Sequence, residues 1–343
     1  MKNTKTLTVI LATVLLVLCA GVTRAKITDY KPFGPLRVRT QHPLYLQLLS
    51  LPMESPQTLN RDQFELTIET VFSNVFEFDN VATTTMDIDM EVWRTALTAT
   101  YGINDQMDVQ IEVPFMTTVG GFSDSFIEGY HNLFGLPYSG RGFVAENRHS
   151  FLVTHRGRRL VNYPRTDFDL SDIRARVKYL LSDHWAWPFK LALAGYIKCP
   201  VGKTEQGLGS GQFDLGFSLL AQKSIRRFHF VSHAGYVLLG KHAYLDAILG
   251  HGFFSFGQSI RFDILDGLSA VVQLTGNTAA FNNVDTRDLE EIILDLNVGF
   301  TGSFTLNHTV FDEFFYQWSF SEDVMSSGPS VDFSVLFMAG VRY

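Results

Sequence analysis

The stretch SVDFSVLFMAGVRY, residues 330–343, alternates apolar and polar side chains up to the last residue of the chain. Val335, Phe337 and Tyr343 fall on the apolar side of this period-2 pattern, whereas Arg342 falls on the other side. Such alternation predicts a β-strand with one apolar face. A soluble sheet seldom ends on an aromatic residue of its apolar face, so the pattern favours a strand whose apolar face meets lipid.

Similar alternation recurs along the chain from residue 62 onward. Each such segment has about the length that a tilted strand needs to cross a bilayer, whereas strands of soluble proteins average about five to six residues. The twelve segments are 62–74, 86–101, 107–118, 170–182, 187–199, 211–223, 227–239, 252–265, 267–276, 288–301, 304–320 and 330–343.

The links between these segments alternate in length. Links such as INDQMD, SIRR and LDG follow even-numbered strands and are short, whereas the links after odd-numbered strands are longer. The longest spans about 119–169. Short turns on one side and long loops on the other are typical of outer-membrane barrels, with the short turns in the periplasm. The sequence therefore predicts an all-β fold, a transmembrane antiparallel up-and-down β-barrel of about 12 strands spanning 62–343, with both ends in the periplasm.

The end of the last strand has the features of an assembly signal. Phe337, Val341 and Tyr343 lie on its apolar face, and Tyr343 is expected in the periplasmic aromatic girdle. We expect the barrel-assembly machinery to recognise this end and outer-membrane lipids to surround the strands.

The first 25 residues resemble a secretory signal peptide. Lys2 and Lys5 precede an apolar run, and Thr23 and Ala25 supply small residues at the cleavage positions. An anchoring helix is less favoured because the run is shorter than the ~20 residues of a spanning helix. A lipidated Cys19 is a further, less favoured alternative. Together, this signal and the barrel pattern predict export and a location in the outer membrane of a Gram-negative cell.

Composition excludes several classes of protein. The net charge of −7 predicts no nucleic-acid partner. Cys199 is the single cysteine after the signal, so no internal disulfide is expected. Apolar and polar residues are intermixed, and no motif for a cofactor is present. Residues 26–61 show no alternation and are rich in proline, which predicts a periplasmic arm or a plug in the barrel.

Four stretches resemble a known family: FGPLRVRTQHPL at 33–44, LSDIRARVKYLL at 170–181, KCPVGKTEQGLGSGQFDLG at 198–216 and FSEDVMSSGPSVDFSV at 320–335. The chain is similar to the uncharacterised outer-membrane proteins of domain-of-unknown-function family 3187 over nearly its whole mature length. The resemblance implies a membrane barrel and implies no activity.

The alternation predicts which charged side chains enter the lumen. The basic ones are Arg174, Arg176, Lys178, Lys190 and Lys198. The acidic ones are Glu65, Glu69, Glu91, Glu112, Glu291, Asp295, Glu313 and Asp332. Strand two departs from alternation at Val92 and Trp93, and strand eleven departs from it at VFDEFF, so both are expected to contain bulges.

Two interpretations of these charges stay open. In the first, an acidic wall faces a basic ladder across a water-filled pore and filters polar solutes. In the second, the lumen is packed, and its charges pair with one another and with Arg37 and Arg39 of the arm. Charges on the lipid face would cost ~2–4 kcal/mol near the midplane, so both interpretations place them inward.

A short helix is expected in the longest link, at SFIEGYHNLFG, where Ser125 and Glu128 form a capping box. It either packs on its own loop or acts as a lid. Its apolar stripe consists of Phe126, Ile127, Tyr130, Leu133 and Phe134.

The histidines predict no metal site. His229 and His233 lie four residues apart on a strand, which separates them by ~13 Å. The loop NRHSFLVTHRGRR at 147–159 is basic and favours contact with anionic lipopolysaccharide over catalysis.

Three functions follow as hypotheses: a passive channel or transporter for small solutes, a closed structural or lipid-interacting barrel, and a membrane-embedded lipid hydrolase. The first is favoured, and no catalytic residues are assigned.

Overall fold

The computed structural model describes residues 34–343 apart from 82, 122, 124–128, 130–146, 182–188, 283, 285–288, 290–291, 307–310, 324–330 and 332. Its short helices are α2 (Pro43–Leu46) and the 3-10 turn η3 (Thr204–Gln206). The strands in this part of the chain are β1 (Phe64–Asn80), β2 (Thr84–Asn104), β3 (Met107–Val119), β4 (Ser150–His155), β5 (Arg158–Asn162), β6 (Thr166–Leu170), β7 (Ile173–Leu180), β8 (Lys190–Cys199), β9 (Asp214–Ile225), β10 (Phe228–Leu238), β11 (Gly252–Leu265), β12 (Leu268–Asn277), β13 (Ile293–Thr305), β14 (Glu313–Asp323) and β15 (Phe333–Arg342). No helix in the described ranges is long and apolar enough to cross a membrane.

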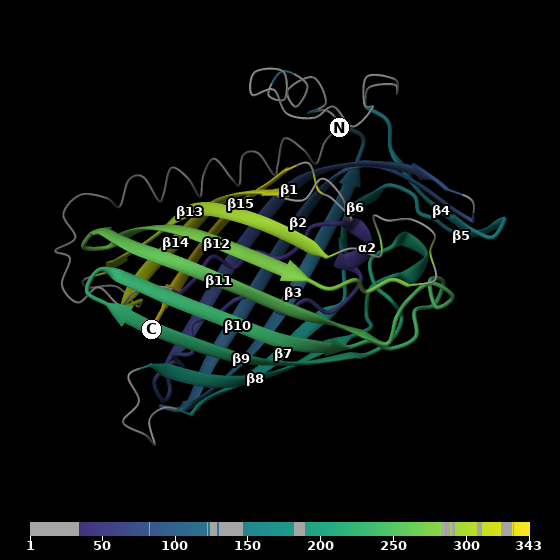
Figure 1. The fold of residues 1–343 in the computed structure, drawn as a ribbon. Helices are drawn as coiled ribbons and strands as arrows, with labels where there is room; N and C mark the ends of the chain where they lie inside the picture. The colour runs from purple at the N-terminus through teal and green to yellow at the C-terminus, as the bar shows by residue number, and fades with distance from the viewer. Residues whose placement is uncertain are drawn as a thin grey trace.

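A closed antiparallel barrel of 12 strands forms the body of the molecule (Figure 1). Its wall runs in the order β1, β2, β3, β7 and then β8 through β15. Strand β15 returns to β1, and the two are paired from Glu65↔Arg342 to Asn74↔Phe333. The backbone N–H of Phe64 also donates to the carbonyl of Tyr343 at 2.8 Å. The predicted fold class and strand number are therefore confirmed.

The link after the first strand differs from the expected long loop. Strands β1 and β2 stay paired as far as Asn80↔Thr85, so most of residues 75–85 belong to one long hairpin that extends beyond the neighbouring strands.

The longest link is also partly strand. Strand β4 pairs with the outer half of β2, from Thr84↔His155 to Asp89↔Ser150, and β5 pairs with β4. The β4–β5 hairpin covers an edge of β2 that would otherwise be unpaired.

Neither of the two expected bulges is present. The register between β1 and β2 stays constant through Val92 and Trp93. Val92 is fully buried on the inner face and Trp93 is exposed on the outer face. Strand β14 begins only at Glu313 and pairs with β15 without a shift. In β2 the expectation failed because the outer half of the lumen is apolar, so the apolar inner face of Val92 does not indicate a change of register. In β14 the inner-face Phe315 is buried in a small apolar cluster at the opposite end of the lumen, again with no change of register.

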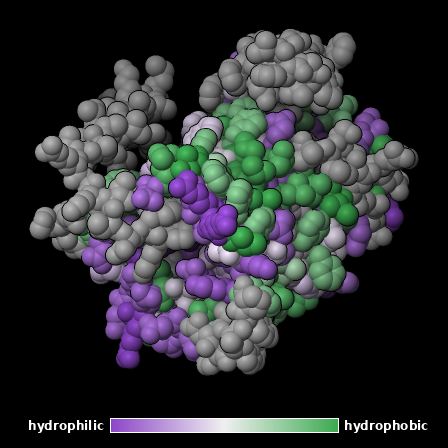
Figure 2. Space-filling view, turned by 60° about the vertical axis from the view of Figure 1, so that its left-hand side comes forward, coloured by the Kyte–Doolittle hydropathy of each residue, from purple (hydrophilic) through white to green (hydrophobic). Residues whose placement is uncertain are grey.

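The outer surface carries an apolar belt to which every wall strand contributes. Ile68 of β1, Leu97 of β2, Phe217 of β9 and Phe337 of β15 are all more than 40% exposed. Figure 2 shows part of this hydrophobic surface beside hydrophilic side chains. Monomeric soluble proteins rarely expose apolar patches larger than a few hundred Å². A belt around a closed barrel is the surface that lipid requires.

Candidate functional site in the barrel lumen

Residues 34–61, here called the arm, occupy the inside of the barrel. Near one end, the carbonyl of Pro35 accepts a hydrogen bond from Gln317 of β14. The chain then passes Arg39, which contacts Glu112 of β3, and reaches α2 near the other end (Figure 1). It returns along the opposite wall, where Ser55 accepts from Lys178, and continues into β1. Contacts with strands around the whole wall show that the arm lies in the lumen.

The outer end of the arm is held by an apolar core. His42 caps α2 by accepting from the N–H of Leu44 at 3.3 Å, and Pro43 occupies the first turn. Tyr45 packs edge-on against Phe281, with ring centroids 5.4 Å apart. The leucines of the segment LYLQLL are nearly or fully buried among inner-face residues of β2 and the outer loops. This part of the lumen is therefore filled by packed side chains.

A charge cluster lies below this core, where Glu112 of β3 receives three arginines. Arg39 of the arm donates to both of its carboxylate oxygens, at 3.0 and 2.8 Å. Arg174 of β7 donates at 2.9 Å, and Arg94 of β2 bridges Glu112 and Glu69 of β1, at 2.7 Å from the latter. None of these five side chains is more than 11% exposed. The three arginines and two carboxylates are partners of one another, which offsets part of the cost of burying their charges.

A second cluster joins the returning half of the arm to β3 and β7. Arg176 lies 3.2 Å from Glu54 of the arm and 2.9 Å from Asp108. Lys178 lies 3.5 Å from the same Glu54 carboxylate. The hydroxyl of Tyr196 donates to the other oxygen of Glu54 at 3.1 Å. The arm is thus bound to the wall through a carboxylate that has three partners.

A third cluster holds the outer loops against the arm. The buried ammonium of Lys198 lies 2.8 Å from Asp172 and 3.3 Å from Asp214, and it donates to the carbonyl of Gln47 at 3.0 Å. The side chain of Gln47 accepts from His242 in the loop between β10 and β11. Burial and the nearby Lys198 charge lower the pKa of His242 to about 4, so this histidine is neutral at pH 7.

At the opposite end of the barrel, Arg342 of β15 joins two neighbouring strands. It lies 2.7 Å from Glu65 of β1 and 2.9 Å from Glu313 of β14. Arg37 of the arm lies 3.5 Å from Glu65. These contacts connect the closing strands of the barrel to the point where the arm enters.

Most of the expected lumen residues fall on the inner face, but they do not form separate acidic and basic walls. Acidic and basic side chains are interleaved on adjacent strands, because Arg174 pairs with Glu112 and Lys178 with Asp108. Lys190 shares the inner face of β8 but is exposed at the end of the strand. Asp295 of β13 is half-buried near the arm.

The expected lumen position of Glu91 is wrong. Because β2 has no bulge, Glu91 lies on the opposite face from the inward Arg94. It is nevertheless buried, and its carboxylate accepts a hydrogen bond from the backbone N–H of Ser123 at 2.6 Å. Glu291 and Asp332 lie outside the described residues, as do the expected signal peptide and the stripe of the loop helix.

The C-terminal residues lie on the outer face of β15. Phe337 and Tyr343 are exposed, and Val341 is half-buried. The ring of Tyr343 lies 5.4 Å from that of Phe64 at the end of β1. The aromatic end of the chain therefore sits at the seam where the barrel closes.

Six charged residues of these clusters were not among the predicted lumen residues: Glu54, Arg94, Asp108, Asp172, Asp214 and Arg342. Arg94 and Asp108 follow from strict alternation along β2 and β3. Asp172 lies just before β7, and Asp214 is the first residue of β9. Their partners come from distant parts of the chain, so no local pattern indicates their role.

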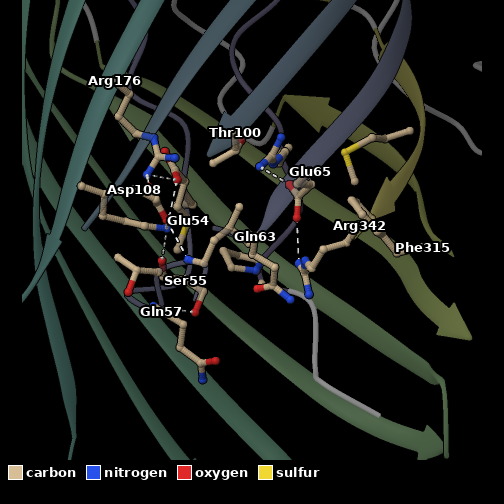
Figure 3. Close-up of a pocket in the computed structure, with 18 of the residues that line it drawn as sticks. Glu54, Ser55, Gln57, Gln63, Glu65, Thr100, Asp108, Arg176, Phe315 and Arg342 are labelled. Atoms are coloured by element: carbon tan, nitrogen blue, oxygen red, sulfur yellow. Dashed lines mark hydrogen bonds and ion pairs between the residues drawn. The ribbon is translucent and has the colours of Figure 1, made fainter. Parts of the chain in front are cut away.

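A cavity of about 230 Å³ remains between the arm and the wall at the end where Glu65 and Arg342 lie. Figure 3 shows Glu54, Asp108 and Arg176 on one side of this pocket and Glu65 with Arg342 on the other.

Residues 8–343 match the family described as protein of unknown function, DUF3187. This chain belongs to that family. No curated protein matches the chain.

Among solved structures, the chain is similar to the COG4313 outer membrane channel from Pseudomonas putida F1. The two share 11% identity and a TM-score of 0.54 over 86% of this chain and 100% of that chain. The NanC porin is similar at 8% identity and a TM-score of 0.45, over 81% of this chain and 98% of that chain. A Pseudomonas aeruginosa FadL homologue is similar at 9% identity and a TM-score of 0.35, over 91% of this chain and 99% of that chain. The first likeness supports the barrel fold, and the other two are more distant in shape.

Proposed function

We propose that this protein is an outer-membrane channel for small solutes whose lumen is closed at rest by the arm. One observation carries the proposal: the arm is held in the lumen by ion pairs to β1, β3 and β7, and its covalent link to the wall is at β1. The apolar belt and the similarity of the barrel to an outer membrane channel support the location. We place the end of the barrel where the arm enters in the periplasm, because the short turns of such barrels face that side.

The polar half of the arm is the part suited to movement. Its contacts through Arg39 and Glu54 are buried ion pairs, which dissolved ions screen weakly while the arm is in place, and the separated charges become hydrated when the arm leaves. Its departure removes the positive charges of Arg37 and Arg39 and the negative charge of Glu54, so these three side chains take one net positive charge out of the lumen. The opened lumen is then expected to prefer cations.

Removal of residues 26–58 tests this proposal in planar bilayers. We expect a conductance well above that of the intact protein, with cation preference. Neutralising Glu65, Glu69 and Asp295 together in the truncated form should abolish the preference. A folded, heat-modifiable truncated protein that conducts no more than the intact one contradicts the proposal and favours a closed structural barrel.

A reversible tether provides a second test in the full-length chain. Ser55 of the arm donates to Gln222 of β9 at 2.9 Å. With Cys199 replaced by serine, cysteines at Ser55 and Gln222 can be joined by a short bifunctional methanethiosulfonate. We expect openings elicited by voltage or urea to disappear on cross-linking and to return with reductant. Equal opening of the cross-linked and free forms would show that the arm does not gate conduction.

A specific observation favours one alternative, an ester hydrolase. Ser224 Oγ lies 2.8 Å from Nδ1 of His229, and Nε2 of that ring lies 2.8 Å from Asp263. Ser224 is exposed at the end of β9. A Ser–His–Asp row of this kind can activate a nucleophile. Labelling of the folded protein by a fluorophosphonate, lost in Ser224→Ala, would support hydrolysis, and an unlabelled wild type would exclude this row as an active site.

A further inference from the structure

The cavity at the periplasmic end is built jointly by the arm and the barrel. Two arm stretches line it, 34–37 and 53–60, together with inner-face residues of β1, β2, β3, β7, β14 and β15. Its volume of about 230 Å³ is below the ~300 Å³ at which pockets for drug-sized ligands begin. It therefore suits a small solute.

The carboxylates of this pocket are already well supplied with donors. Glu54 receives Arg176, Lys178 and the Tyr196 hydroxyl. Asp108 receives Arg176 and the N–H of Leu59, the latter at 3.1 Å. A carboxylate with two or more charged or N–H donors offers little to an incoming cation.

On the other side of the pocket, Arg37 has more N–H groups than its ion pair with Glu65 uses. Arg37 has five N–H donors, and its side chain makes one ion pair, at 3.5 Å, with a Glu65 carboxylate that Arg342 approaches more closely, at 2.7 Å. The side chain of Arg37 is still 23% exposed. The basic side chains that line the cavity are Arg37, Arg176, Lys178 and Arg342, against the acidic Glu54, Glu65 and Asp108.

We propose that this pocket binds a small carboxylate-bearing solute, with Arg37 as the residue that receives the carboxylate. Arginine presents paired N–H groups that match the two oxygens of a carboxylate. The side-chain amides of Gln57 and Gln63 lie in the same lining and supply further donors.

Binding at this pocket stabilises the closed form. Because the arm supplies Arg37 and part of the lining, the pocket is complete only while the arm is inside the barrel. A ligand that binds one state and not the other shifts the equilibrium toward the state it binds. The solute is therefore expected to raise the unfolding midpoint of the folded protein. This regulation rests on the proposed closure by the arm, whereas the binding itself can be measured without any conduction.

Calorimetric titration of the detergent-solubilised full-length protein at constant ionic strength tests the site. Succinate is the probe, neutral succinamide and cationic 1,4-diaminobutane are its controls, and thermal unfolding is followed in parallel. We expect succinate to bind and to raise the unfolding midpoint. Arg37→Gln should weaken binding at least tenfold, and Arg37→Lys should weaken it less because it keeps the charge. Arg61→Gln is the matched control, because Arg61 belongs to the arm but is exposed and lies outside the lining.

Several outcomes would overturn the site. These are absence of succinate binding, equal binding of succinamide, preferential binding of diaminobutane, or unchanged affinity in a heat-modifiable Arg37→Gln protein. If Arg37→Gln does not fold, the same affinity in Arg37→Lys and wild type would overturn the role of the guanidinium. Loss of the site with an intact effect of arm removal on conductance would leave the channel proposal standing.

Discussion

At the residue scale, Glu112 is the charge on which the central network depends. It contacts Arg39, Arg94 and Arg174 at once, and all three come from different segments of the chain. Without it, Glu69 would be the carboxylate left to balance Arg94 within this cluster. Burying charges costs free energy unless each has a partner, so the network is only as stable as its shared carboxylate.

We therefore expect Glu112→Gln to lower the free energy of unfolding by about 3–5 kcal/mol, the usual cost of breaking a buried ion pair. Urea unfolding of the refolded protein in detergent measures it. Glu205→Gln, at an exposed position of η3, is the control and should change stability by no more than ~0.5 kcal/mol. An equal, small effect of both substitutions would show that the cluster does not stabilise the fold.

His242 makes a second prediction at this scale. Its pKa is about 4 in the folded protein and ~6.5 in the unfolded chain. Between these values the unfolded chain binds a proton that the folded protein does not, so this stabilisation is complete above pH ~6.5 and decreases as the pH falls toward 4. We expect His242→Gln to show a smaller drop in the thermal unfolding midpoint between neutral pH and pH ~4.5. An unchanged pH dependence would show that His242 does not contribute.

At the element scale, β7 places its charged side chains on the inner face of the barrel wall and its apolar side chains on the outer face. Arg174, Arg176 and Lys178 are buried inside, whereas Val177 is 48% exposed on the outer face. A one-residue change of register would move every one of these side chains to the other face.

Cysteine labelling tests both the register of β7 and the position of the arm. A cysteine in place of Arg176 should be protected from a hydrophilic thiol reagent in intact membranes and should react after residues 26–58 are removed. A cysteine in place of Val177 should stay protected in both forms, because lipid covers it. Labelling of the Val177 position in either form would contradict the register.

At the scale of the whole molecule, the barrel depends on closure between its first and last wall strands. The backbone groups of Phe64 and Tyr343 exchange hydrogen bonds, and their rings lie 5.4 Å apart. Arg342 adds ion pairs on the inner side of the same seam. The seam thus carries aromatic contacts outside and charged contacts inside.

We expect Tyr343→Asp to reduce the amount of heat-modifiable protein in the outer membrane severalfold, because a charge replaces the aromatic at the lipid interface. Quantified gel shifts of outer-membrane fractions measure this. Val201→Asp introduces the same charge at an exposed position of an outer loop and is the control. Wild-type amounts of both variants would argue against a role of the terminus in assembly.

The sequence by itself determined the barrel, its twelve wall strands and the apolar end of the last one. Period-2 alternation is local, since each side chain meets either lipid or the lumen wherever its strand lies. That rule assumes a polar lumen, and it failed where the assumption failed. Val92 lies on the inner face and belongs to the apolar cluster that contains the arm leucines. An apolar side chain was not expected on that face, so the prediction placed a bulge in β2, which is absent, and put Glu91 on the wrong face.

Only the tertiary structure decided that the arm fills the lumen and how the buried charges are partnered. Arg39, Arg94 and Arg174 are separated widely along the chain and meet at Glu112 only because barrel closure and the path of the arm bring them together. The same closure creates the pocket beside Glu65 and Arg342, whose lining comes from both ends of the arm and from distant strands. Such a site has no local pattern, because the free energy of each buried charge depends on partners that are distant in sequence.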